Sequence, residues 1–373
     1  MTARSFLETA NLFLAANLLL IAVFFHLLPV LTRRDIFFAV TIDPAYRRSG
    51  EARQTLHQFR VAVWIHTLGG LAAVFLGTIL HSIFLPLAGV FWLTGAAFWA
   101  FRKARKRTMP HAALLASLHR EASLTRRAAV GIHVYRLLQI GPFALLAAVA
   151  LYLNANWNRI PERFPVHWGM DGQPNGWATR SFLGVFGPLL IAFTICVGTA
   201  IFAYATVHWS RQIRASGRGA DREHRFRQTQ LGIMLAVEYF IALTFAGVGL
   251  MPLRAQPREI PAGSSLYFLG TLAFVLAILA IAVHTGQGGE NLMKAGESSD
   301  ISIPDGFPIG DRTPDACWKC GIFYMNRNDP AIMVESRFGV GYTMNLAHAA
   351  GWLILGAIIG VPLAIVLLTT LHD

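Results

Sequence analysis

The chain has 373 residues, of which 54% are hydrophobic and only 14% are charged. Soluble domains usually carry about 25% charged residues, so this composition excludes an ordinary cytosolic enzyme, a disordered chain and a collagen-like fibre. Three cysteines are too few for a scaffold held together by several disulfides. Together with a mean hydropathy of +0.48, these values predict an all-α polytopic membrane protein.

Runs without charged residues locate the membrane spans, because a helix needs about 20 apolar residues to cross a bilayer. The run at 61–101 is long enough for two crossings with a tight turn at 81–83. The run at 11–31 is too long for the apolar part of a cleavable signal peptide, so we expect it to remain as a helix. About eight transmembrane helices are predicted, at 11–31, twice within 61–101, and at 134–153, 182–207, 231–252, 266–284 and 351–371.

The net charge is +12, from 32 Lys and Arg against 20 Asp and Glu. The loops 32–60, 102–133, 208–230 and 285–350 hold 25 of the basic residues. The segments on the opposite side of the membrane, including the one before the first span, hold 6. Basic residues collect in cytoplasmic loops, so this pattern predicts a multi-pass protein of the bacterial inner membrane with both termini extracytoplasmic. The topology accounts for the charge, and we expect the lipid bilayer as a partner and not nucleic acid.

Composition divides the chain into six parts. Residues 154–181 are rich in Pro, Gly and Trp and are predicted to form an extracytoplasmic cap loop, whereas 285–314 has the composition of a flexible linker. The inner segment 102–133 fits either a helix lying on anionic lipid or, as we favour, a solvated connector. The parts are 1–153 with four spans and basic inner loops, the cap loop 154–181, 182–284 with spans five to seven, the linker 285–314, a small cytoplasmic domain at 315–346, and 347–373 with the last span.

The cap loop carries a first group of candidate functional residues. Its prolines and glycines exclude a helix and predict successive tight turns, one of them at Asp171-Gly172. His167 and Asp171, with Glu162, could supply nitrogen and oxygen ligands to a metal, but we favour hydrogen bonds from these side chains to the turns. The candidate outer site, which would meet an extracellular peptide or toxin, consists of His167, Trp168, Asp171 and Trp177.

A second group of polar residues lies within the predicted spans. Glu238 falls in the cytoplasmic half of the sixth span, and His26, His66 and Arg136 fall at a similar depth. Ionisable groups inside a bilayer are costly and usually face the interior of a helix bundle. We therefore predict an inner-leaflet polar layer in which Glu238 pairs with Arg136 or with a histidine. The layer could carry protons or a solute, although hydrogen bonding between helices is the favoured interpretation.

The segment 315–346 is predicted to be compact and to contain short strands. Hydrophobic residues at 322–324 and 332–334 predict two strands on either side of the turn-forming segment 326–330. Cys317 and Cys320 form a lone C-x-x-C, for which packing is favoured over redox or metal chemistry, because structural zinc needs four ligands. The candidate site for a cytoplasmic protein partner consists of Trp318, Tyr324, Asn326, Asp329, Thr343 and Asn345.

The sequence contains no constellation that predicts an enzyme. It lacks the H-E-x-x-H, P-loop and nucleophile-elbow motifs, and its predicted spans carry no paired carboxylates. No catalytic residue, cofactor or metal is therefore assigned.

Two segments resemble domains of known membrane proteins. The outer sequence I-P-E-R-F-P-V-H-W-G-M-D-G-Q-P-N-G-W, through Pro165, His167, Trp177 and their neighbours, resembles the uncharacterised domain of SdpI-type immunity membrane proteins. The inner sequences W-K-C-G-I-F-Y-M-N-R-N-D-P and R-F-G-V-G-Y-T-M-N resemble a second uncharacterised domain that often accompanies the first. Founding members of this family protect bacteria from a self-made toxin and can relay its presence to a repressor.

The resemblance implies a protein that senses or resists a membrane-active agent and relays its presence to a cytoplasmic partner. A small-solute or proton-coupled transporter that uses the inner-leaflet polar layer is the first alternative. A structural membrane scaffold is the second.

Overall fold

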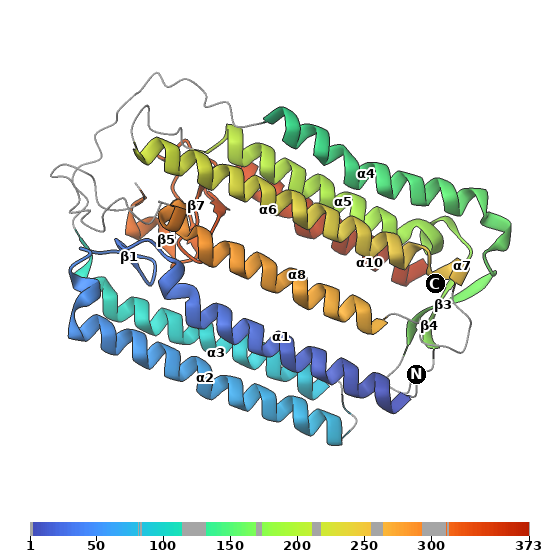
Figure 1. Cartoon of the computed structure of the whole chain (residues 1–373), viewed down its shortest axis with the longest axis horizontal. Helices are drawn as coiled ribbons and strands as arrows, with labels where there is room; N and C mark the ends of the chain where they lie inside the picture. The colour runs from blue at the N-terminus through green and yellow to red at the C-terminus, as the bar shows by residue number, and fades with distance from the viewer. Residues whose placement is uncertain are drawn as a thin grey trace.

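The computed structural model describes residues 3–80, 82, 84–113, 132–168, 174–210, 218–254, 264–292, 311 and 313–372. It shows a polytopic α-helical membrane protein whose long helices lie side by side along the longest axis of the molecule (Figure 1). Within the described residues, seven helices are long and apolar enough to cross a membrane. The predicted fold class is confirmed.

The first seven predicted spans each correspond to one long helix. The eighth falls on a shorter apolar helix, Ala349–Ile365, in which α9, a π-helical turn and the start of α10 follow one another. The helices are α1 (Ala3–Leu31), α2 (Gly50–Ile79), α3 (Phe84–Thr108), α4 (Ile132–Ala155), α5 (Phe182–His208), α6 (Arg218–Gly249), the short α7 (Met251–Arg254), α8 (Ser264–Thr285), α9 (Ala349–Leu355), the π-helical η6 (Gly356–Gly360) and α10 (Val361–His372).

Short strands and 3₁₀ turns occupy the segments between the long helices. The strands form four antiparallel pairs, β1 with β2, β3 with β4, β5 with β6 and β7 with β8. The strands are β1 (Ile36–Phe37), β2 (Val40–Thr41), β3 (Arg163–Trp168), β4 (Pro174–Thr179), β5 (Trp318–Lys319), β6 (Phe323–Tyr324), β7 (Met333–Glu335) and β8 (Tyr342–Met344), and the 3₁₀ turns are η1 (Tyr46–Arg48), η2 (Met109–His111), η3 (Trp157–Arg159), η4 (Gln287–Leu292) and η5 (Asp315–Cys317).

The helices pack as two groups with separate apolar cores. In the first group, α1, α2 and α3 bury Leu18, Val63 and Leu93 against one another. In the second, α4, α5 and α6 bury Leu146, Ala192 and their neighbours. The helix α8 lies between the groups and contacts α1 and α6 (Figure 1), while α10 lies along α5.

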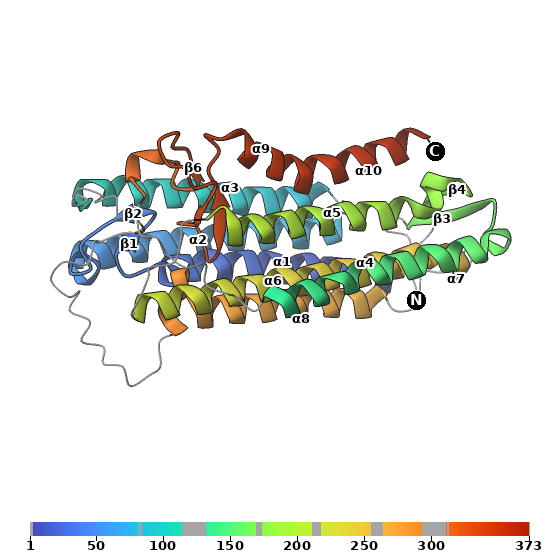
Figure 2. The same ribbon diagram turned by 90° about the horizontal axis from the view of Figure 1, so that it is seen from above.

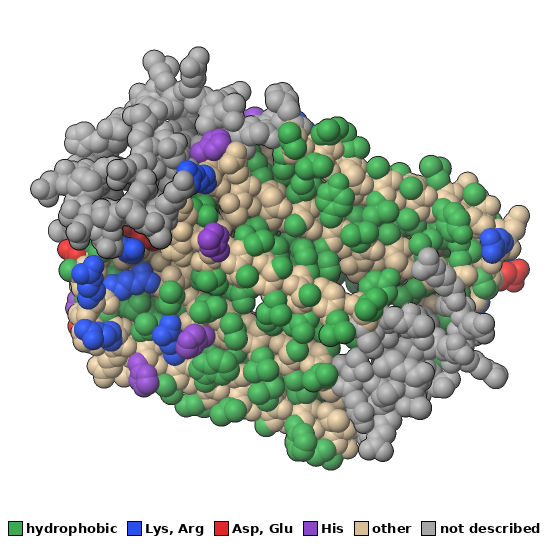
Figure 3. Space-filling view, viewed as in Figure 1, with side chains coloured by type: hydrophobic (Ala, Val, Ile, Leu, Met, Phe, Trp, Pro, Cys, Tyr) green, Lys and Arg blue, Asp and Glu red, His purple; other side chains and the backbone are tan. Residues whose placement is uncertain are grey.

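The outward faces of the helices are apolar. On the face that Figure 3 shows, hydrophobic side chains are spread over the surface between the two ends of the bundle, and few charged side chains lie among them. Phe84, Phe91 and Leu68 expose 79%, 74% and 67% of their surface. An apolar surface of this extent is expected where lipid rather than water surrounds the helices.

The extramembrane elements lie at the two ends of the bundle. The β3–β4 hairpin lies at one end, together with the start of α1 and the end of α10, whereas β1, β5 and β7 lie at the other (Figures 1 and 2). Lys and Arg side chains gather at this second end, which is the end predicted to be cytoplasmic (Figure 3). The outer and inner candidate sites are therefore separated by the length of the bundle.

The structure adds two details of the inner segments that the sequence did not predict. Strands β6 and β7 form where strands were predicted, but they pair with β5 and β8 and not with each other. The predicted linker 285–314 contributes buried residues at both of its ends, since Gln287, Asp311 and Thr313 are 0%, 7% and 1% exposed. Its residues 293–310 and 312 lie outside the described residues, as do 114–131 of the predicted connector.

Candidate functional site

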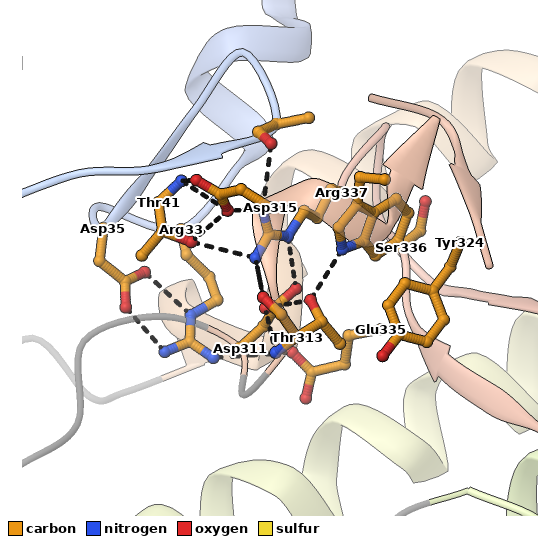
Figure 4. Close-up of polar contacts among 12 residues, drawn as sticks. Arg33, Asp35, Thr41, Asp311, Thr313, Asp315, Tyr324, Glu335, Ser336 and Arg337 are labelled. Atoms are coloured by element: carbon orange, nitrogen blue, oxygen red, sulfur yellow. Dashed lines mark hydrogen bonds and ion pairs between the residues drawn. The ribbon is translucent and has the colours of Figure 1, made fainter. Parts of the chain in front are cut away.

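A buried arginine, Arg337, forms hydrogen bonds with several of the inner segments. The side chain of Arg337 is fully buried and forms two parallel hydrogen bonds of 2.8 Å with the Asp311 carboxylate (Figure 4). It also donates to the Asp315 carboxylate and, at 2.6 Å, to the Thr313 carbonyl oxygen. These three partners precede it by 22 to 26 residues, so the pairing closes the inner domain on itself.

The same arginine joins the inner domain to the first inner loop. Its guanidinium donates to the Ala39 carbonyl oxygen and to Thr41 Oγ1, both at 3.0 Å. Asp315 adds to this contact by accepting a 2.8 Å hydrogen bond from Thr41 Oγ1. Residues almost 300 positions apart in the chain are thereby held in one polar network.

The charges within this network stabilise one another. Burial alone would raise the pKa of the Asp311 carboxyl, but the charge and hydrogen bonds of Arg337 outweigh burial and lower that pKa to about 2. Burial alone would likewise lower the pKa of Arg337, but Asp311 and Asp315 hold it above its ordinary value. A second cation, Arg33, forms hydrogen bonds of 3.1 Å with both oxygens of Asp35 (Figure 4). Arg337 and Asp311 are therefore ionised and paired near neutral pH.

An aromatic side chain next to Arg337 fixes the domain to the helix bundle. The Phe338 ring stacks on Phe98 with centroids 5.3 Å apart and meets the edges of Phe25 and Phe101 at 6.0 Å and 5.2 Å. These three partners come from α1 and α3. The dipeptide Arg337-Phe338 thus ties the domain to the first helix group through both a polar and an apolar contact.

Most of the residues predicted to meet a cytoplasmic partner have internal structural roles. Asn345 donates to the Asn326 carbonyl oxygen at 2.8 Å and accepts from the Asn326 backbone N–H at 2.9 Å. The Tyr324 hydroxyl donates to Asp329 at 2.8 Å, and the Trp318 indole N–H donates to Thr313 at 2.8 Å. Four of the predicted residues are buried: Trp318, Tyr324, Asp329 and Asn345.

The exposed surface of the inner domain lies on neighbouring residues. Phe323 and Met325 flank the buried Tyr324 and expose 51% and 39% of their surface. Arg327 beside them is exposed, while Asn326 and Thr343 are half-buried. Alternation along a strand explains this pattern, because successive side chains point to opposite faces. Phe323, Met325 and Arg327, which the sequence did not single out, therefore lie on the exposed surface of the inner domain.

The outer hairpin contains the first candidate group. Phe164 and Ala178 face each other across β3 and β4 and are buried. The exposed His167 ring forms a hydrogen bond with the Asn175 side chain, which matches the favoured turn-stabilising role. The Arg163 guanidinium lies 5.4 Å from the centre of the Trp177 ring. Asp171 and the side chain of Trp168 lie outside the described residues.

One helix, α5, connects the outer hairpin to the inner domain. At its beginning, Val185 is buried in one cluster with Phe164 and Ala178 of the hairpin. At its end, Ala205 is buried in one cluster with Met333 of β7. The Trp209 carbonyl oxygen, directly after the helix, accepts hydrogen bonds of 3.0 Å and 3.1 Å from the backbone N–H groups of residues 332 and 333. The helix therefore contacts both extramembrane pieces directly.

The intramembrane polar residues are not brought together as predicted. Glu238 is fully buried and accepts a 3.2 Å hydrogen bond from Gln139 of α4, not from Arg136 or a histidine. Arg136 is exposed because it lies about 100° around α4 from Tyr135, which shares a helix face with Gln139. His26 accepts a 3.1 Å hydrogen bond from Trp64, and His66 packs against Trp92.

The Glu238 carboxylate is only half satisfied. Its second oxygen, Oε2, is buried and has no hydrogen-bond partner among the described residues. Cys196 of α5 lies beside Glu238, with its Sγ 3.7 Å from the Glu238 carbonyl oxygen. Glu238 thus faces the interior of the α4–α5–α6 group, as its residue type predicts, but with a neutral amide as its partner.

Comparisons with known proteins match the two extramembrane segments. A model described as a domain of unknown function (DUF1648) matches residues 144–193, and one described as a family of unknown function (DUF5808) matches residues 327–352. The first match runs from α4 through the β3–β4 hairpin into α5, and the second runs through β7 and β8 into α9. No curated protein and no solved structure matches the chain.

Proposed function

We propose that this chain is an SdpI-like protein of the bacterial inner membrane, which senses or resists a membrane-active agent and relays its presence to a cytoplasmic protein. The observation that carries this proposal is the continuous path through α5, which contacts the hairpin at one end and β7 at the other. The two matches to domains of unknown function lie at the two ends of this path and are consistent with an SdpI-type family.

The outer hairpin is the part that would meet the agent. It presents the exposed His167 and the half-buried Trp177 at the end of the bundle opposite the basic loops. By the preference of basic residues for cytoplasmic loops, this end faces away from the cytoplasm. Aromatic side chains at a membrane surface favour an amphipathic partner, such as an extracellular peptide or toxin.

The inner domain is the part that would meet the cytoplasmic protein. Phe323 and Met325 form an exposed apolar surface beside Arg327. A change in the position of α5 would reach this domain through the Trp209 carbonyl and the Ala205–Met333 contact. A packed helix transmits such a change because closely packed interiors have low compressibility.

The proposal is tested by challenging a deletion strain with a panel of membrane-active peptides. We expect deletion to sensitise the cells to at least one peptide and the wild-type gene to restore tolerance. A double His167→Ala, Trp177→Ala variant should fail to restore tolerance, whereas the matched variant Asn158→Ala, an exposed residue before the hairpin, should restore it. Unchanged tolerance to every peptide after deletion would contradict the proposal.

A second candidate function, a proton-coupled or small-solute transporter, is favoured by one observation. The Glu238 oxygen that has no partner among the described residues lies buried among α4, α5 and α6, where a proton or a solute group would form a hydrogen bond with it. If this site takes part in transport, Glu238→Gln abolishes substrate or proton flux in proteoliposomes. Gln139→Leu then alters the affinity of the protein for the transported substrate or proton. Transport that persists in Glu238→Gln rejects this second function.

A further inference from the structure

The end of α3 borders an open cleft of about 950 Å³ at the basic end of the molecule. Five cationic side chains between Arg102 and Arg107 line it, together with Trp99, Met109 and Cys320, and none of the described residues that line it is a carboxylate. The β5–β6 turn lies against this part of α3, since a Cβ on Gly321 would be 3.1 Å from Arg105 and from Phe101. The cleft is therefore a positively charged recess between a membrane helix and the inner domain.

Two of the five cations already have protein partners. Arg105 turns inward and donates to the carbonyl oxygens of Ala39 and Asp315, and Arg107 donates to the Gln58 side chain. The other three, Arg102, Lys103 and Lys106, are exposed and form no ion pair within the part of the chain that the structure describes. Three cations are thus available to an anionic ligand.

These three cations lie where the lipid-facing stripe of α3 ends. Spacings of three, four and seven residues from Trp99 place all three on the same helix face as this exposed indole. The stripe before them is apolar, with Phe91, Trp92 and Trp99 exposing 74%, 58% and 60% of their surface. The Lys103 ammonium lies 5.2 Å from the centre of the Trp99 ring. Tryptophan followed by lysine and arginine marks the depth of the lipid headgroups.

We propose that this cleft binds the headgroup of an anionic phospholipid from the adjoining leaflet. The phosphate oxygens would accept hydrogen bonds from Arg102, Lys103 and Lys106, and the acyl chains would lie along Trp99 and Phe91. A lipid is favoured over a soluble anion because the cations continue an exposed apolar stripe. The proposal does not depend on the function proposed above, since none of the residues that line the cleft takes part in that function.

Lipid titration followed by native mass spectrometry tests the site. We expect phosphatidylglycerol to bind the wild-type protein more tightly than phosphatidylcholine. The triple variant Arg102→Gln, Lys103→Gln, Lys106→Gln should bind phosphatidylglycerol on the order of 100-fold more weakly. The matched triple variant Arg48→Gln, Arg53→Gln, Arg225→Gln loses the same charge from exposed positions outside the cleft and should bind like the wild type. An equal loss in both variants, or equal binding of both lipids, overturns the proposal.

Alkylation of the native Cys320 gives a second measurement that needs no variant. This exposed thiol lines the cleft, so we expect phosphatidylglycerol, and not phosphatidylcholine, to slow its modification as followed by peptide mass. Inorganic phosphate at the same concentration should leave the rate unchanged. Protection by phosphate as strong as that by phosphatidylglycerol would show a free-anion site and reject the lipid, and no protection by either would reject the site.

Discussion

Arg337 is a fully buried cation held between two carboxylates, and its removal leaves the buried Asp311 carboxylate without its cation. Breaking a buried ion pair on one side typically costs about 3–5 kcal/mol. We therefore expect Arg337→Met to destabilise the inner domain by about this amount and to speed hydrogen exchange of the β7 amides. Arg327→Met, at an exposed position of the same domain, is the control and should leave exchange unchanged. Unchanged exchange in Arg337→Met would contradict the structural role of the network.

The depressed pKa of Asp311 predicts the acid stability of the domain. Its folded pKa of about 2 lies below the unfolded value of about 3.9. The ion pair therefore stabilises the folded state above about pH 4, and this stabilisation, on the order of 2–3 kcal/mol, is lost as the pH falls from about 4 to about 2. The midpoint of thermal unfolding should drop across this range in the wild type and drop less in Asp311→Asn. The exposed control Asp43→Asn should behave like the wild type, and identical pH profiles for all three proteins would refute this assignment.

The candidate residues could be predicted by type but not by role. Trp318, Tyr324 and Asn345 stand out in the sequence because such residues commonly form either binding surfaces or buried networks. Their burial depends on contacts with backbone groups that fold around them, such as the Asn326 amide held by Asn345. Gln139 was missed as the partner of Glu238 because an amide within an apolar span gives no charge signal.

The junction between α5 and the outer hairpin contains a glycine whose size matters. A Cβ on Gly184 would lie 2.2 Å from the Thr179 carbonyl oxygen at the end of β4. Gly184→Ala should therefore displace the hairpin from α5, lower the stability by about 1–3 kcal/mol and reduce peptide tolerance. Thermal unfolding in detergent and the challenge assay together measure these effects.

Gly232→Ala in α6 is the matched control for this substitution. A Cβ on Gly232 meets no atom within 4 Å, and alanine is favoured over glycine inside a helix by about 0.5–1 kcal/mol. This variant should be as stable as the wild type or more stable, with full tolerance. If Gly184→Ala behaves in the same way, the hairpin does not depend on its close contact with α5.

Elements imposed by the membrane were predictable, and those formed by long-range pairing were not. The bilayer sets both the length and the composition of the spans, so charge-free runs locate the long helices, while the charged first turns of α2 and α6 extend beyond these runs. Strands of two or three residues carry no comparable signal, and their partners are chosen by the fold. For that reason β6 and β7 were located while their pairing with β5 and β8 was missed.

The whole molecule is asymmetric along the membrane normal. Lys and Arg side chains gather at the end that holds the small inner domain, and the β3–β4 hairpin lies at the other end (Figures 1 and 3). Under the proposed function, this asymmetry separates the part that would meet the agent from the part that would meet the cytoplasmic protein. The roles proposed for the hairpin and for the inner domain depend on which aqueous compartment each end faces.

Cysteine accessibility in spheroplasts tests this central claim most directly. The native Cys320 is exposed on the inner domain, and His167 is exposed on the hairpin. With a membrane-impermeant maleimide, we expect His167→Cys in a Cys320→Ser background to be labelled in intact spheroplasts. Native Cys320 should be labelled only after the membrane is permeabilised. Labelling of both positions in intact spheroplasts, or of neither before permeabilisation, would contradict the account.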